Sequence, residues 1–256
     1  MKVRILGCGA AAGVPGISFG WGRCNPANPR NRRLRPSILV SEGDVRILVD
    51  TTPDLREQLL AAGEKRLDGV LYTHAHADHI HGIDDLREVN RAMAGPVHVY
   101  ATAEVIDTLT HRFAYVFGEL DPAKYPVYKP MLIPHAVSGR FDVAGVEVVA
   151  YEQDHGYMKS TGFRFGRLAY STDLVDMPDE SFDTIAGVDV WIVSCILQGR
   201  SHETHAHLEK VLDWVERVRP RRTILTHMGA SLDYDELRSK LPPSIEPAYD
   251  GMEFEV

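Results

Sequence analysis

The sequence predicts an α/β fold in which helices cover β-sheets. Short apolar runs rich in Val and Ile, which indicate strands, alternate along the chain with segments whose apolar residues recur at helical spacing. No linker, low-complexity segment or short repeat divides the 256 residues, so we expect a single domain spanning residues 1–256. The composition agrees with this interpretation, because 44% hydrophobic and 25% charged residues are typical of a globular chain with a sizeable core.

The first half of the chain is predicted to alternate between strands and helices. Residues 2–6 indicate a strand, and residues 37–41 and 45–50 indicate a hairpin that turns at Gly43. Further strands are expected over residues 69–73 and 96–100, and helices over residues 53–63, 83–95 and 102–118. Residues 118–140 contain four prolines and show no clean period, so we expect a long loop that serves as a lid or binding element.

The second half begins with a block rich in strands and ends with helices and strands in alternation. A helix over residues 207–218 is predicted by the helical spacing of Leu208, Val211, Leu212, Val215 and Val218. A shorter helix is expected over residues 233–241. The expected strands are residues 146–155, 160–166, 167–173, 188–196, 221–227 and 251–256.

The charge and composition exclude several classes of protein. A formal net charge of −8 and a pI near 5.8 argue against a protein that coats nucleic acid or an anionic membrane. No apolar run reaches transmembrane length, and the first residues lack the apolar region of a signal peptide. Cys8, Cys24 and Cys195 are widely spaced and provide no disulfide framework, so we expect a reducing, cytoplasmic location.

The N-terminal glycine-rich segment raises the question of dinucleotide binding. Residues 7–16, GCGAAAGVPG, follow the first predicted strand, as the glycines of a Rossmann fold would. A Rossmann fold also needs a helix directly after the glycines, but residues 16–36 are rich in Gly, Pro and Asn, which break helices. We therefore expect no dinucleotide site here.

A cluster of histidines after one buried strand carries the strongest functional signal. Residues 74–81, HAHADHIH, hold four histidines and one aspartate. His74 and His76 are two residues apart, so in an extended segment both side chains point to the same side. Asp78 and His79 are expected to open the following helix and to face a second point nearby. Because zinc and similar divalent ions prefer imidazole and carboxylate ligands, this loop can supply four ligands split between two ions.

Three further donors stand in equivalent places later in the chain. His155, Asp173 and His227 each stand at the end of a predicted apolar strand, just as the histidine cluster comes directly after one. If these strand ends share one edge of the fold, seven donors meet there, and Asp173 would bridge two ions. His81 is expected to lie outside the ligand set.

The histidine cluster also carries a family resemblance. Residues 74–79, HAHADH, resemble the H-x-H-x-D-H signature of the metallo-β-lactamase superfamily of binuclear hydrolases, and the later donors follow in that superfamily's order. The resemblance implies a four-layer αββα sandwich with two metal ions at one edge. The implied ligands are His74, His76 and His155 for one ion, Asp78, His79 and His227 for the other, and Asp173 as the bridge. Asp50, at the end of an early strand, would orient a histidine ligand.

Several segments are similar to one subgroup of this superfamily, the PhnP-like cyclic phosphodiesterases close to ribonuclease Z. The segments are LGCGAAAGVP (6–15), RNRRLRPSILV (30–40) and YDGMEFEV (249–256), so the similarity runs nearly end to end. His76 stands where the oxygen-reducing branch of the superfamily typically has glutamate, which favours a hydrolase. The subgroup places a histidine facing the substrate phosphate before a late helix, which implies that role for His205, with His207 as the second choice.

The early basic loop departs from the subgroup and supplies further candidates. PhnP itself has several cysteines here that hold a structural zinc, whereas this loop has only Cys24, so we expect no structural Cys-bound zinc. Five arginines lie within thirteen residues, namely Arg23, Arg30, Arg32, Arg33 and Arg35. Arginine forks suit phosphate oxygens, and we expect Arg33 and Arg35 to bind the substrate phosphate.

The expected function is that of a metal-dependent phosphodiesterase with two divalent ions per chain, zinc or manganese, with iron also compatible with the donors. A hydroxide that bridges the ions would attack phosphorus, with Asp78 and His205 as catalytic residues. The expected substrate is a small anionic phosphodiester, cyclic or linear, or a nucleotide, rather than a large nucleic acid, and no membrane partner is expected. The sequence leaves the oligomeric state open, and the resemblance suggests a homodimer.

Two alternatives remain open. A lactone, lactam or thioester hydrolase would use the same hydroxide, and a non-catalytic nucleotide- or metal-binding module would keep the fold without turnover. The sequence names neither the natural substrate nor the native metal.

Overall fold

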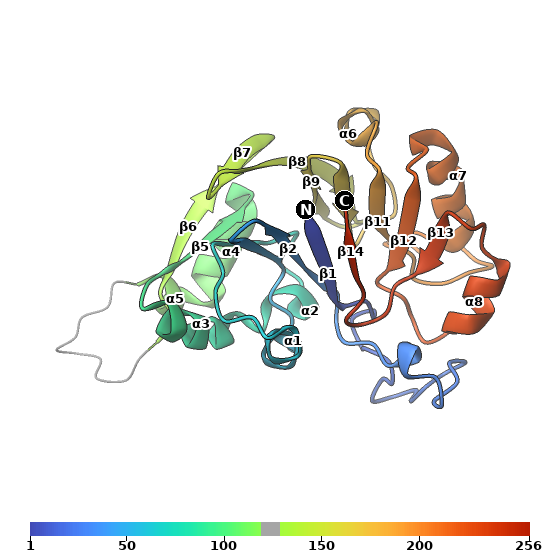
Figure 1. Cartoon of the computed structure of the whole chain (residues 1–256), viewed down its shortest axis with the longest axis horizontal. Helices are drawn as coiled ribbons and strands as arrows, with labels where there is room; N and C mark the ends of the chain where they lie inside the picture. The colour runs from blue at the N-terminus through green and yellow to red at the C-terminus, as the bar shows by residue number, and fades with distance from the viewer. Residues whose placement is uncertain (119–128) are drawn as a thin grey trace.

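Alternation of side chains along the strands gives each sheet one face toward the other sheet and one face toward helices. In β2 (Ser37–Glu42), Ile38 and Val40 belong to the core between the two sheets, whereas Leu39 belongs to a second core beneath helices. The computed structural model describes residues 1–118 and 129–256, and it consists of two sheets packed face to face with helices outside (Figure 1). The predicted α/β class and four-layer αββα sandwich are confirmed.

The first sheet has seven strands within the described residues. Strands β3 to β6 run parallel, and an antiparallel pair of β1 and β14 brings the two ends of the chain side by side (Figure 1). The order across the sheet is β14 (Glu253–Glu255), β1 (Lys2–Gly7), β2, β3 (Val45–Val49), β4 (Gly69–Leu71), β5 (Val97–Ala101) and β6 (Leu132–Ala136).

The second sheet also has seven strands in the part of the chain that the structure describes. The order is β13 (Ile245–Pro247), β12 (Arg222–Thr226), β11 (Val190–Ser194), β10 (Leu168–Ser171), β9 (Lys159–Phe165), β8 (Val146–Asp154) and β7 (Arg140–Val143). Strands β10 to β13 are parallel, and β9 is antiparallel to both β8 and β10. The carboxyl ends of β8, β10 and β12 therefore open at the same edge.

Helices cover the outer face of each sheet. Leu55 and Leu109 pack in the core beneath the helices of the first sheet, and Trp214 and Leu237 join the large core on the second. The α-helices are α1 (Leu55–Ala62), α2 (Ala77–Ile80), α3 (Leu86–Met93), α4 (Ala103–Arg112), α5 (Ala114–Phe117), α6 (Asp179–Ile185), α7 (Leu208–Val218) and α8 (Tyr234–Lys240). Short 3-10 helices cover Pro29–Asn31 and Ile83–Asp85. None of the helices in residues 1–118 and 129–256 combines the length and apolar character needed to cross a lipid bilayer.

The region predicted as a long loop, residues 118–140, contains a strand. β6 pairs with β5 at the end of the first sheet, where Pro134 stands opposite Val99. Proline has no N–H to donate and is tolerated on an edge strand, so the prolines of this region did not exclude a strand there. Residues 119–128 of the predicted loop lie outside the described residues, and its role as a lid stays a prediction.

Other boundaries also differ from the sequence-based expectation. The single helix expected over residues 102–118 is divided into α4 and α5, because Phe113 leaves the helical conformation with a φ of −125°. The short elements β7, α6 and β13 were not predicted, since none has enough residues to display a clear apolar period.

Candidate metal centre

The histidine loop lies at the carboxyl end of β4 and leads into α2. His76 is the N-cap residue of α2 in an extended conformation, with φ −73° and ψ 153°, and Asp78 and His79 stand in the first turn of that helix. The loop therefore changes from extended to helical backbone between its two pairs of donors. This change lets four nearby residues face two different points, as the spacing predicts.

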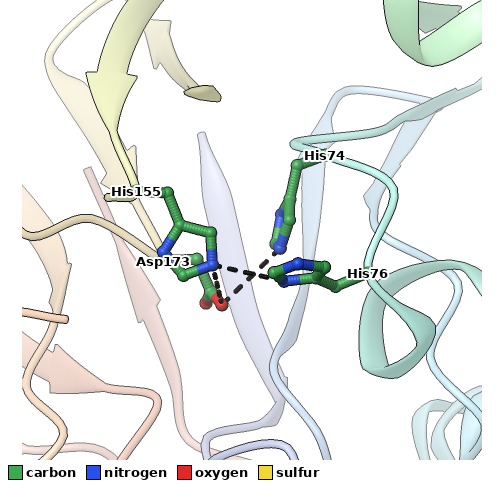
Figure 2. A group of neighbouring side chains, drawn as sticks. All are labelled: His74, His76, His155 and Asp173. Atoms are coloured by element: carbon green, nitrogen blue, oxygen red, sulfur yellow. Dashed lines mark hydrogen bonds and ion pairs between the residues drawn. The ribbon is translucent and has the colours of Figure 1, made fainter. Parts of the chain in front are cut away.

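The first group of donors comprises His74, His76, His155 and Asp173, and Figure 2 shows their side chains converging between the two sheets. Nε2 of His74 and Nε2 of His155 each lie 3.6 Å from Oδ2 of Asp173. Nε2 of His155 also lies 3.2 Å from Nδ1 of His76. One potential ligand atom from each residue lies within 4.8 Å of all the others.

The second group comprises Asp78, His79, His227 and again Asp173. Oδ1 of Asp173 lies 3.4 Å from Nε2 of His79 and 3.0 Å from Nε2 of His227. Oδ2 of Asp78 lies 3.3 Å from Nε2 of His79 and 3.6 Å from Nε2 of His227. One oxygen of Asp173 thus faces each group, so that this carboxylate stands between them.

The donor atoms of both groups fit divalent metal ions. Ligands bound about 2.0–2.1 Å from one tetrahedral zinc ion lie about 3.3 Å apart, which is close to the separations seen here. Nε2 of His74, His79 and His227 and Oδ2 of Asp78 are buried without a hydrogen-bond partner. Buried polar atoms normally have partners, and these atoms belong to clusters that could hold metal ions, so cations are their natural partners.

The electrostatics of the centre favour the metal-binding forms of His74 and Asp173, whereas at His79 the carboxylates of Asp173, Asp78 and Asp50 outweigh burial and raise the pKa well above its ordinary value. Burial, aided by the neighbouring His79, lowers the pKa of His74 well below its ordinary value. Burial alone would raise the pKa of Asp173, but His227 and His79 outweigh it and lower that pKa well below its ordinary value. A neutral imidazole and an ionised carboxylate are the forms that bind a metal ion.

Hydrogen bonds behind the donors set their orientation. Nδ1 of His155 lies 2.7 Å from the carbonyl oxygen of Thr204, so it donates there and leaves Nε2 toward the centre. Nδ1 of His79 lies 2.7 Å from Oδ2 of Asp50, which follows β3. Asp50 is fully buried and also accepts hydrogen bonds from the N–H and the hydroxyl of Thr73. The structure thus places Asp50 where it can orient a histidine, as the resemblance implies.

Three of the six non-glycine residues with a left-handed φ in the described part of the chain lie at this centre. Asp50, Asp173 and His227 have φ values of 65°, 53° and 52°, in the left-handed region that non-glycine residues rarely adopt. Each of them lies within two residues of the carboxyl end of a strand. Such conformations cost about 1–3 kcal/mol each and occur mostly at functional sites, where the surrounding structure enforces them.

His205 lies beside the centre and outside both groups of donors. Its ring stacks on His227 with centroids 4.9 Å apart and contacts His155 edge to face, also at 4.9 Å. Burial, together with His227, lowers the pKa of His205 to about 3. His207 is the N-cap residue of α7, so His205 is the one of the two histidines that the structure brings to the centre.

The prediction that Arg33 binds the substrate phosphate is wrong, because its side chain is inside the protein. Arg33 is 1% exposed, and its Nη2 donates to the carbonyl oxygen of Leu232 at 2.7 Å. Arg35 is partly exposed, but its Nη1 forms an ion pair of 2.8 Å with Asp54, and its Nε donates to the carbonyl of Ala11. Arg33 is therefore not available to a substrate, and Arg35 is already engaged through Nε and Nη1.

A different arginine of the basic loop reaches the neighbourhood of the centre. A pocket of about 420 Å³ is lined by Arg23 together with His205 and His227. The side chain of Arg23 is 67% exposed, and among the described residues it forms one loose ion pair, of 3.7 Å, with Glu236. Sequence alone gives no signal that separates Arg23 from the other arginines of this loop.

The fold and the paired clusters define a metallohydrolase of the metallo-β-lactamase type. Residues 45–228 match the family model described as "Beta-lactamase superfamily domain". A solved structure described as a "New Diphosphatase from the PhnP Family" is 33% identical, with a TM-score of 0.90, and the match covers 100% of this chain and 97% of that one. The chain therefore belongs to the beta-lactamase superfamily and, within it, to the PhnP-like branch.

Two curated relatives extend the comparison. An octanoyltransferase of Porphyromonas gingivalis is 31% identical over 258 residues, which cover 99% of this chain but 51% of that protein. A ribonuclease Z of a Bradyrhizobium species is 33% identical over 141 residues, covering 54% of this chain and 46% of the relative. Each match covers about half the length of the relative, so the activity in its name is not assigned to this chain.

Proposed function

We propose that the protein is a dinuclear phosphodiesterase that cleaves a small phosphodiester, cyclic or linear, or a nucleotide-like substrate. The observation that carries this proposal is the placement of Asp173, whose two carboxylate oxygens each face one group of histidines. A carboxylate in that position can be shared by two ions held about 3.5–4 Å apart, a spacing common in enzymes that displace an oxygen at phosphorus.

His74, His76 and His155 would hold one ion, and Asp78, His79 and His227 the other, with Asp173 shared. Bound ions supply Lewis-acid stabilisation of phosphoryl oxygens and lower the pKa of a coordinated water toward about 7. Imidazole and carboxylate donors accept zinc, manganese or iron, and we expect zinc or manganese.

Asp78 and His205 are the proposed catalytic residues of the chain itself. Oδ2 of Asp78 is buried and without a hydrogen-bond partner, so it is free to hold a water molecule or a metal ion at the centre. Nδ1 of His205 is also buried without a partner, in a ring that stacks on His227. An imidazole N–H in this place can donate to a phosphoryl oxygen or to the leaving oxygen of the substrate.

The relatives support phosphate chemistry. The 33% identical solved structure is described as a diphosphatase and the Bradyrhizobium relative as a ribonuclease Z, so both names denote cleavage of phosphate linkages. Two features of this chain support a small substrate, namely the net charge of −8 and a pocket of about 420 Å³ beside the centre.

Turnover of bis(4-nitrophenyl) phosphate by protein loaded with Mn²⁺ or Zn²⁺ tests the proposal. We expect the wild-type chain to release 4-nitrophenolate and Asp173→Asn to lose on the order of 100-fold or more in kcat. Asp179→Asn on α6 is the matched control, because the Asp179 side chain is 82% exposed and forms a surface ion pair with Arg217. An intact two-metal centre that turned over no phosphodiester would count decisively against the proposal.

A carbonyl hydrolase acting on a lactone, lactam or thioester is the alternative, and the octanoyltransferase relative makes acyl substrates worth testing. His205→Ala separates the two reactions. Loss of this histidine is expected to reduce phosphodiester cleavage far more than thioester cleavage, because it is proposed to contact a phosphoryl or leaving oxygen. Tight nucleotide binding with only weak metal binding would instead favour a non-catalytic module.

A further inference from the structure

The pocket beside the metal centre has an apolar wall that the proposed chemistry does not use. Its lining includes residues 10–12, which are all alanine, together with Phe19 and Ile196. None of these side chains can donate or accept a hydrogen bond, so the wall selects for an apolar surface. His205 and His227 also line the pocket, and His227 belongs to the second group of donors. Any ligand bound at the centre therefore has this wall within its reach.

Phe19 is a half-exposed aromatic residue whose ring packs against the backbone of its own turn. The backbones of Gly16 and Gly20 form two mutual hydrogen bonds of 2.8 Å, which close a tight turn around residues 17–19. The ring lies across Gly16, where an added Cβ would come within 2.3 Å of Cζ of Phe19. Phe19 remains 47% exposed. A half-exposed ring that packs against its own turn and lines a pocket is suited to stacking on a planar partner.

The turn that carries Phe19 is anchored to the segment that follows His227. The N–H of Arg23 donates to the carbonyl oxygen of Ala230 at 2.8 Å. Gly22 has a φ of 55° and packs so closely that an added Cβ would lie 2.7 Å from the same carbonyl oxygen. The position of Phe19 relative to the centre is therefore set by backbone contacts, which pre-organise the pocket.

Arg23 supplies a cation at the same pocket. Its side chain is 67% exposed and makes an ion pair of 3.7 Å with Glu236, which is too long for a strong hydrogen bond. An anionic group on the ligand can therefore form an ion pair with the Arg23 guanidinium without disrupting buried structure. The pocket thus combines an apolar wall, a half-exposed aromatic ring and a cation next to the place proposed for the phosphate.

From these contacts we infer that the pocket binds a planar aromatic group carried by the phosphate ester, stacked on Phe19, and that Phe19 determines substrate specificity. The inference rests on the proposed function for the position of the phosphate. It deepens that function by naming the substrate class, because esters whose pocket-side group is aromatic are favoured over esters with a small alkyl group.

Calorimetric titration of the Mn²⁺-loaded full chain with phenyl phosphate and with ethyl phosphate tests the inference without requiring turnover. We expect phenyl phosphate to bind roughly tenfold more tightly, the effect of one stacked ring. Phe19→Ala should bring the ratio of the two affinities close to one. Phe19→Tyr should keep the roughly tenfold preference for phenyl phosphate, and Phe19→Leu should keep only part of that preference. Ile17→Ala is the matched control, because Ile17 lies in the same turn, is 104% exposed and does not line the pocket.

Equal affinity of the wild-type chain for the two phosphates overturns the inference. An undiminished preference of Phe19→Ala for phenyl phosphate over ethyl phosphate overturns it as well. The proposed function fails separately. If the chain binds phenyl phosphate preferentially but cleaves no phosphodiester, the reaction is wrong and the aromatic pocket stands. If it cleaves phosphodiesters with no aromatic preference in binding, the pocket inference alone is wrong.

Discussion

His79 and Asp50 form a buried pair in which Nδ1 of the histidine lies 2.7 Å from Oδ2 of the carboxylate. Both side chains are 0% exposed. Because Asp50 holds Nδ1, Nε2 of His79 is the ring atom that faces Asp78 and Asp173. Asp50 thus sets the orientation in which His79 faces a metal ion, although Asp50 itself belongs to neither group of donors.

Asp50→Asn is expected to weaken binding of one of two metal ions about 10- to 100-fold. The amide keeps the shape of the side chain but lacks the charge that fixes the tautomer of His79. Competition with a chromogenic chelator measures the two affinities, and Asp179→Asn serves as an exposed control. Wild-type affinity for both ions in Asp50→Asn would show that the carboxylate does not orient the ligand.

Removal of metal is expected to destabilise the folded chain. The centre then holds Nε2 of His74, His79 and His227 buried without partners, and two carboxylates, Asp78 and Asp173, near one another. Free metal at about 100 times its Kd should stabilise the native state by about 2.7 kcal/mol. Melting curves with chelator and with added Mn²⁺ or Zn²⁺ measure the difference. Superimposable curves would mean that no ion binds the native centre.

The donors of the centre could be predicted from the sequence because each is tied to a local pattern. Four come from one short motif, and His155, Asp173 and His227 follow apolar strands. Parallel strands carry their carboxyl ends to one edge, so a position in the sequence becomes a position in space without knowledge of the remaining contacts. The structure brings all seven donors into two overlapping groups.

The arginines and the edge strand could not be predicted in this way. Arg23, Arg33 and Arg35 share one irregular loop, where no period relates sequence spacing to side-chain direction. Long-range contacts determine whether each of these side chains is buried or exposed. Arg33, for example, donates a hydrogen bond to the carbonyl oxygen of Leu232, 199 residues away. The sequence did not predict β6 for a related reason. Pro134 is acceptable in a strand only because β6 lies at the end of the sheet, which the sequence does not reveal.

Arg33→Lys is expected to reduce the free energy of unfolding by about 2–4 kcal/mol. Lysine cannot reproduce the planar fork that contacts the carbonyl oxygens of Gly229 and Leu232, and its charge would be buried with fewer partners. Arg35→Lys should cost no more than about 1 kcal/mol, because the Arg35 side chain is 30% exposed. Urea denaturation of both variants measures the contrast. Equal effects would contradict the structural role assigned to Arg33.

Asp250→Asn is expected to change how stability depends on pH. Burial raises the pKa of Asp250 from 3.8 to about 7, although its carboxylate accepts hydrogen bonds from the N–H groups of Leu34 and Cys8. Between about pH 4 and pH 7 the native state therefore retains a proton that the unfolded chain has lost. The contribution of Asp250 to stability is complete below this window and declines as pH rises through it, by up to about 1.4 kcal/mol per pH unit.

Urea denaturation across the window, for the wild-type chain and Asp250→Asn in chelator, isolates this slope as the difference between the two free energies of unfolding. A difference independent of pH would mean that Asp250 is ionised throughout, held so by its two N–H donors.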